Sequence, residues 1–132
     1  EVDALDAGKV TRIVFCSGKV YFDLYQARQK QGLGNVALVR IEQLYPFPHD
    51  AYGAVLDAYP NAKEVLWCQE EPENQGAWYQ IKHRLSAYLR PHQHLLYATR
   101  KGSASTAVGY LKVHQKQQDE VVHAALAGGV RM

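Results

Sequence analysis

Three acidic residues follow an apolar run near the middle of the sequence. The stretch VLWCQEEPENQGAW (65–78) passes from hydrophobic residues to Glu70, Glu71 and Glu73, and it resumes with Trp78. Paired carboxylates at the end of a strand can transfer protons when burial moves their pKa values apart. They can also accept backbone N–H bonds at a helix N-terminus, or receive basic side chains from a neighbouring subunit. No nucleophile, metal motif or cofactor element adjoins them in the sequence, so we favour these last two roles and predict no catalytic residue.

A second candidate is the Ser17-Gly18-Lys19 turn, which follows the apolar run TRIVFC (11–16). A turn between a strand and a helix can direct backbone N–H groups at an anion. The turn lacks the spacing of the standard nucleotide-binding fingerprints, and Ser17 as the N-cap of the next helix is an alternative that stays open. If an anion binds here, Lys19, Arg40, Arg100 and Lys101 are the basic residues that can converge on it.

Metal and serine chemistry are poorly supported. The six histidines do not follow a metal-ligand spacing, and neither cysteine is paired with one. Ser103 and Ser105 lack the glycines of a nucleophile elbow. We therefore predict no metal site and no serine hydrolase.

Composition restricts the class of protein. A chain of 132 residues is the size of one domain, and fifteen Lys and Arg against thirteen Asp and Glu give a net charge of only +2. This balance predicts neither nucleic-acid nor membrane binding. Cys16 and Cys68 lie far apart in apolar runs, which indicates buried free thiols in a reducing compartment. No apolar run is long enough to span a membrane and no signal peptide is recognisable, so we expect a soluble intracellular protein.

Strands and helices alternate along the predicted chain. Strands are expected at 11–16, 36–42, 64–68 and 95–99, and helices at 20–31, 49–58, 77–89 and 115–127. This alternation predicts an α/β fold with a mainly parallel sheet covered on both faces. The loops after the strands, at 17–19, 43–48, 69–76 and 100–105, should then meet at one functional edge. Residues 1–10 read as a linker tail cut from a longer chain, 11–127 as the domain, and 128–132 as a second tail.

Four motifs carry a resemblance to a known family. FCSGKVYFDL (15–24), VALVRIEQLYPFP (36–48), WCQEEPENQGAW (67–78) and SASTAVGYLKVHQKQQ (103–118) occur in that order. They resemble the C-terminal domain of the thiamine-diphosphate-dependent first component of the 2-oxoglutarate dehydrogenase complex, over about residues 11–126. The resemblance implies a transketolase-like, three-layer α/β/α sandwich.

The resemblance also implies an activity for the parent enzyme, which decarboxylates 2-oxoglutarate and transfers the succinyl group to a lipoyl group. Thiamine diphosphate and Mg²⁺ belong to other domains in this family, so the chain alone should bind neither and should be inactive. The family works as a homodimer with a lipoyl-bearing succinyltransferase and a dihydrolipoyl dehydrogenase, in the bacterial cytoplasm or the mitochondrial matrix. Nucleic acids and membranes are not expected partners.

The resemblance gives the acidic stretch an interface role, in which it docks against neighbouring domains of the dimer. The residues concerned are Glu70, Glu71, Asn74, Gln75 and Trp78. Some relatives also have an allosteric acyl-CoA site, which suggests acetyl-CoA as a ligand. For this site we name Ser17, Lys19 and Arg40 from their charge and position alone.

Two other functions stay open at this stage. The chain could be a stand-alone regulatory module that binds an acyl-CoA or a nucleotide on the same fold. It could also belong to a homologue specific for 2-oxoadipate, because the substrate pocket lies in domains that this sequence does not contain.

Overall fold

The computed structural model describes residues 5–100 and 111–132, apart from the side chains of 111–114. A short 3-10 helix, η1 (Ala7–Lys9), precedes the first strand. The strands are β1 (Arg12–Cys16), β2 (Val36–Arg40), β3 (Glu64–Pro72), β4 (His94–Arg100) and β5 (Val130–Arg131). The helices are α1 (Val20–Gln31), α2 (His49–Ala58), α3 (Trp78–Ala87) and α4 (Leu111–Ala127).

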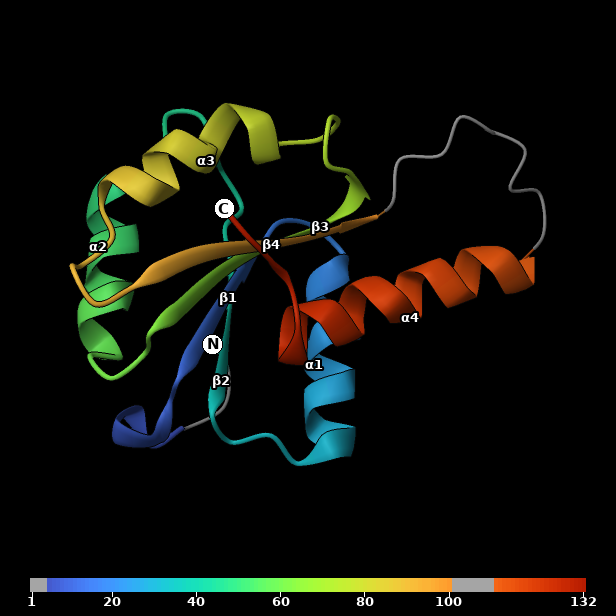
Figure 1. Ribbon diagram of the computed structural model, residues 1–132, viewed down its shortest axis with the longest axis horizontal. Coiled ribbons are helices and arrows are strands. Elements are labelled where there is room, and N and C mark those ends of the chain that lie inside the picture. Colours follow the sequence, from blue (N-terminus) through green and yellow to red (C-terminus); the bar gives the residue numbers. More distant parts are fainter. Residues whose placement is uncertain (1–4, 101–110) are drawn as a thin grey trace.

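The strands form one twisted sheet in the order β2-β1-β3-β4-β5 (Figure 1). β1 pairs in parallel with both β2 and β3, and β3 pairs in parallel with β4. Only the short β5 is antiparallel among the pairings of the described residues. The prediction of a mainly parallel sheet is therefore confirmed.

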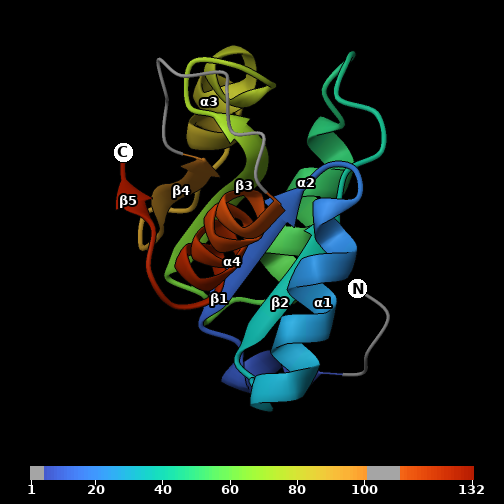
Figure 2. The same ribbon diagram turned by 90° about the vertical axis from the view of Figure 1, so that its right-hand side faces the viewer.

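Helices cover both faces of the sheet, with α1 and α4 on one side and α2 and α3 on the other (Figure 2). Along β1, Ile13 and Phe15 point toward α2 and α3, whereas Val14 and Cys16 point toward α1 and α4. All four side chains are buried, because a strand covered on both faces has no solvent-facing side. The architecture is the predicted α/β/α sandwich.

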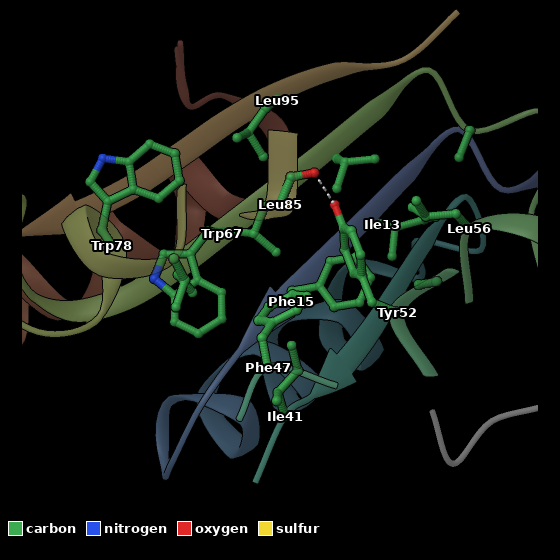
Figure 3. Packing of buried hydrophobic residues seen from close by; sticks show 14 of the residues in the cluster. Ile13, Phe15, Ile41, Phe47, Tyr52, Leu56, Trp67, Trp78, Leu85 and Leu95 are labelled. Atoms are coloured by element: carbon green, nitrogen blue, oxygen red, sulfur yellow. Dashed lines mark hydrogen bonds between the residues drawn. The ribbon is translucent and has the colours of Figure 1, made fainter. Parts of the chain in front are cut away.

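The core beneath α2 and α3 is rich in aromatic side chains (Figure 3). The Phe15 ring lies 4.9 Å from that of Tyr52, and the Trp78 ring lies 4.7 Å from that of Tyr97. Tyr52 is almost fully buried, and its hydroxyl donates to the backbone oxygen of Leu85 at 2.8 Å. This bond ties α2 to α3 and satisfies a phenol that would otherwise be buried without a partner.

Two element bounds differ from the predictions in ways that affect the function. β3 continues to Pro72 rather than ending at residue 68, so Glu70 and Glu71 belong to a strand and not to a loop. α4 begins at Leu111, four residues before the predicted start. β3 is extended by its pairing with β4, which resumes at Pro72 and Arg100 after an irregularity that follows Cys68.

The segment 128–132, predicted as a tail, contributes the fifth strand. Val130 and Arg131 pair with Tyr97 and Leu96 of β4. Gly129 makes the sharp return from α4 at φ 101°, and an added Cβ there would lie 2.7 Å from a methyl carbon of Leu66. A glycine is thus required by both conformation and space.

Cys16 and Cys68 are opposite each other in the β1–β3 register and are free and fully buried. Burial raises the pKa of Cys16 from 9.0 to about 12, against a smaller opposing effect of the Arg40 charge. Burial also raises the pKa of Cys68 well above its ordinary value. The folded state therefore keeps both thiols protonated under conditions that ionise them in the unfolded chain.

We expect stability to fall in alkaline solution for this reason. A raised pKa stabilises the fold fully below the unfolded thiol's pKa of 9.0, and this contribution is lost as pH rises toward about 12. The loss should reach about 1 kcal/mol per thiol near pH ~10. Urea titrations at several pH values would measure it, with Cys16→Val as the variant in which the slope should decrease. An identical slope in that variant would contradict the prediction.

Candidate functional site

The strand order places a topological switch point between β1 and β3. The chain leaves β1 into α1 on one face of the sheet, and it leaves β3 into α3 on the opposite face. In open parallel sheets the crevice at such a point, at the carboxyl ends of the strands, is the usual ligand or contact site. The turn 17–19 and the acidic segment 70–76 both border it, which makes this edge the candidate site.

Hydrogen bonds from the side chain of Gln69 hold the acidic segment in place. Its side chain is buried, and its Oε1 accepts hydrogen bonds from Trp67 Nε1 and from the backbone nitrogen of Trp78, each at 2.9 Å. Its Nε2 lies 2.7–3.2 Å from three backbone oxygens, those of Glu71, Pro72 and Gln75. One amide thus connects the end of β3, the following turn and the first residue of α3.

Gly76 closes this turn. It has φ 67°, and an added Cβ would lie 3.2 Å from the Gln69 amide nitrogen and from two side-chain atoms of Glu71. Positive φ and a crowded position both favour glycine here. The strand-to-helix connection is therefore fixed by an amide, a turn and a glycine, and the carboxylates are not needed to cap α3.

The carboxylate of Glu70 belongs to a second network, which connects β3 with α1 and α4. Gln118 is buried, and its Nε2 donates to Glu70 Oε1 at 3.0 Å and to Asp23 Oδ2 at 2.8 Å. Arg100 donates from its Nε to the backbone oxygen of Glu70 at 2.9 Å, and from its guanidinium to the side-chain oxygens of Gln117 and Gln118. The amide of Gln118 separates two acidic groups that would otherwise repel each other.

A cavity of about 300 Å³ opens beside this network and is lined by Lys19, Glu70, Glu71 and Arg100. Two cationic and two anionic side chains surround it, so its charge is balanced. Such a lining suits a polar partner that offers both donors and acceptors, such as another protein segment. It does not concentrate positive charge in the way that a dedicated polyanion site does.

The predicted interface residues differ in exposure, and Glu70 is half-buried in the network described above. Glu71, Asn74 and Gln75 are exposed at the carboxyl edge and can meet a neighbouring domain. Trp78 is 1% exposed and lies in the aromatic core, so its ring is not available as the predicted docking contact. The first residue of α3 is anchored inward because Gln69 binds its backbone nitrogen.

The predicted anion residues are only partly brought together. α1 begins at Val20 with Lys19 in the N-cap position, and no side chain caps it there, so the Ser17 cap is not formed. Arg40 pairs with Glu42 at 3.0 Å and its guanidinium lies over the Tyr21 and Phe22 rings, whereas Lys19 borders the cavity at the switch point. Lys101, Ser103 and Ser105 lie outside the described residues.

No group of three or more histidine, cysteine, aspartate or glutamate side chains that could hold a metal ion occurs within residues 5–100 and 115–132. In the described part, none of the helices is long and apolar enough to cross a membrane. The acidic edge thus offers positioning contacts and charge.

Comparison with known proteins assigns the sequence to a family. The family model described as "2-oxoglutarate dehydrogenase C-terminal" matches residues 1–126. The chain belongs to this family. Its relatives include the 2-oxoglutarate dehydrogenase E1 components of Cupriavidus necator and Coxiella burnetii, each 49% identical over 125 and 128 residues. The match covers 95% and 96% of this chain, but only 13% and 14% of those proteins.

The fold of this 2-oxoglutarate dehydrogenase C-terminal domain is also found in a solved structure, described as a split-gene transketolase in an inactive β4 tetramer. The TM-score is 0.61 at 11% sequence identity, over 92% of this chain and 39% of that one. At this identity the likeness concerns the fold alone. It agrees with the transketolase-like sandwich that the sequence motifs implied.

Sequence reasoning missed the residues that hold the edge of the 2-oxoglutarate dehydrogenase C-terminal domain together. Gln69 and Gln118 were not singled out, although a glutamine directly after the apolar run VLWC is an amide in a buried strand. A buried polar side chain requires partners, and this was the available signal for Gln69. For Gln118 no local signal exists, because its partners Asp23 and Glu70 are 95 and 48 residues away.

Proposed function

We propose that this domain is the C-terminal part of a thiamine-diphosphate-dependent first component of a 2-oxoglutarate dehydrogenase complex. The parent enzyme would decarboxylate 2-oxoglutarate and transfer the succinyl group to a lipoyl group. The observation that carries the proposal is 49% identity to E1 components over 95% of this chain. The chain spans 13–14% of those relatives, and we propose that the activity belongs to the whole protein and that the domain's own role is structural and regulatory.

Thiamine diphosphate and Mg²⁺ would be bound by parts of the parent protein outside this chain. Mg²⁺ requires several oxygen ligands in near-octahedral geometry. At the candidate site Glu70 is engaged by Gln118, and Lys19 and Arg100 border the same cavity, so the donor set does not fit a divalent cation. We accordingly propose no catalytic residue here.

The test is the decarboxylation activity of the full-length parent protein. Release of carbon dioxide from 2-oxoglutarate is measured with thiamine diphosphate and Mg²⁺, beside 2-oxoadipate as the alternative substrate. Selective turnover of 2-oxoglutarate is the expected result. Turnover of 2-oxoadipate alone would show that the parent enzyme acts on 2-oxoadipate. No turnover of either compound would reject the enzymatic assignment in favour of a binding module.

The domain would act by holding the parent enzyme together. We propose that it packs against the other domains of a homodimer, in a complex with a lipoyl-bearing succinyltransferase and a dihydrolipoyl dehydrogenase, in the cytoplasm or the mitochondrial matrix. The exposed side chains of Glu71, Asn74 and Gln75 at the carboxyl edge support this role. We also propose acetyl-CoA as a regulatory ligand at the turn 17–19 that precedes α1, with weaker acetyl-CoA binding in Lys19→Ala as the test.

Replacing both carboxylates should impair the parent enzyme. We expect Glu70→Ala with Glu71→Ala to raise the dimer dissociation constant about tenfold, because a half-buried network member and an exposed docking group are lost together. Sedimentation and the decarboxylation rate are the measurements, with the exposed Glu120→Ala on α4 as the control. Unchanged assembly and rate in the double variant would remove the docking role.

A further inference from the structure

The sequence contains a long interval without acidic residues. Between Glu73 and Asp119 there is no aspartate or glutamate, whereas this interval contains seven lysines and arginines. Although the whole chain is nearly neutral, this interval therefore carries a strong local excess of positive charge. α3 lies entirely within this interval and forms part of the outer layer of the molecule (Figure 1).

The outward side of α3 is basic. Trp78, Ile81 and Leu85 face the core, which leaves His83 and Arg84 exposed and Lys82 partly exposed. Within the described residues, neither Lys82 nor Arg84 is paired with a carboxylate. Arg90, just after the helix, differs in being neutralised by Asp57 at 2.9 Å.

Exposed tyrosines border these basic residues. Tyr45, Tyr79 and Tyr88 are 55%, 50% and 39% exposed, which makes them three of the six large hydrophobic side chains exposed in the described part. Tyr45 donates its hydroxyl to Gln80 of α3, and the ammonium of Lys82 lies 4.2 Å from the centre of the Tyr79 ring. Exposed tyrosine next to arginine is the composition typical of protein interfaces.

A polar atom without a partner lies beneath the same surface. The His49 ring packs between Phe47 and Tyr88, at 5.2 Å and 4.8 Å. Its Nδ1 is buried, and no other described residue forms a hydrogen bond with it. Buried polar atoms normally have a hydrogen-bond partner, so the Nδ1 of His49 is an unusual group to find next to Tyr88.

We infer that this α3 surface is a docking site for an acidic segment of another protein. The α3 surface consists of Tyr45, Tyr79, Lys82, His83, Arg84 and Tyr88. Its cations would attract and orient the carboxylates of the partner, and the tyrosines would supply the contact area that an ion pair at a protein surface lacks. The docking goes beyond the proposed function, which requires no contact at this surface.

The experiment uses the full-length parent protein and a fluorescent oligo-L-glutamate as the acidic probe, with binding followed by anisotropy at low ionic strength. The test variant is Lys82→Glu with Arg84→Glu. The matched control is Lys9→Glu with Lys63→Glu, which changes the net charge equally at two exposed lysines outside the α3 surface. Lys82→Gln with Arg84→Gln repeats the test with a milder change, in case the charge reversal prevents folding.

We expect affinity for the probe to fall at least about tenfold in the Lys82 and Arg84 variants and less than about twofold in the control. Equal losses in the test and control pairs would show a general charge effect and overturn the proposal. Absence of binding to the unmodified protein would overturn it too, because the surface would then be covered or unsuitable. Tighter binding of oligothymidylate than of oligoglutamate would assign the surface to nucleic acid instead.

Discussion

Gln69→Ala should lower the free energy of unfolding by about 3 kcal/mol. The substitution leaves the Trp67 indole and the Trp78 backbone N–H without their acceptor, and three backbone oxygens at 71, 72 and 75 without their donor. Each buried group left without a partner costs about 1–3 kcal/mol, although water can reach the exposed end of the turn. Urea denaturation measures the loss, and near-ultraviolet circular dichroism reports the environment of the two tryptophans.

Two variants separate the hydrogen bonds from simple loss of volume. Gln69→Glu has the same shape and can still accept from Trp67 and Trp78, but its carboxylate cannot donate to the three oxygens. We expect it to destabilise the fold at least as much as Gln69→Ala, because it also buries a charge. The exposed Gln26→Ala should change stability by less than about 0.5 kcal/mol. If Gln69→Glu left the free energy of unfolding unchanged, the amide donor would contribute nothing to stability.

Arg12→Met is expected to cost about 2–3 kcal/mol, the next largest effect. Arg12 is a buried residue at the start of β1, and its Nη1 donates to the backbone oxygens of Ala124 and Ala125 at 3.3 and 2.9 Å. These carbonyls belong to the last turn of α4; that of Ala124 also accepts from the backbone nitrogen of Gly128 at 2.8 Å, so the bond from Arg12 matters most for Ala125. Methionine keeps much of the apolar stem but removes the donor that Arg12 provides to the carbonyl of Ala125.

Glu64→Gln isolates the other contact of Arg12. The carboxylate of Glu64 lies 3.0 Å from the guanidinium, but its side chain is 43% exposed, so the ion pair is partly screened by water. Such a pair contributes less than about 1 kcal/mol. Thermal and urea denaturation of both variants, at low and high salt, would compare the contacts. If Glu64→Gln proved the more destabilising of the two, the ion pair and not the helix end would be the principal contact of Arg12.

The candidate site was predicted in part. The sequence located the carboxyl edge and the acidic segment, because apolar runs ending in charged or glycine-containing turns are local features. It assigned Trp78 to an interface, since a tryptophan beside an acidic loop looks the same in sequence whether its ring points in or out. It also placed Arg40 with Lys19, whereas the fold directs Arg40 to Glu42 and the rings of Tyr21 and Phe22.

By itself the sequence determined the order of strands and helices, the parallel sheet and the family. Apolar runs, helical periodicity and the four ordered motifs each occupy a short stretch of sequence. They can therefore be recognised without knowledge of any long-range contact. Only the tertiary structure decided that Gln69 and Gln118 organise the edge, that residues 130–131 complete the sheet, and that Tyr45 lies against α3. The hydrogen-bond partners of these polar groups and strand edges are far apart in the sequence. They come close together only after the sheet has formed.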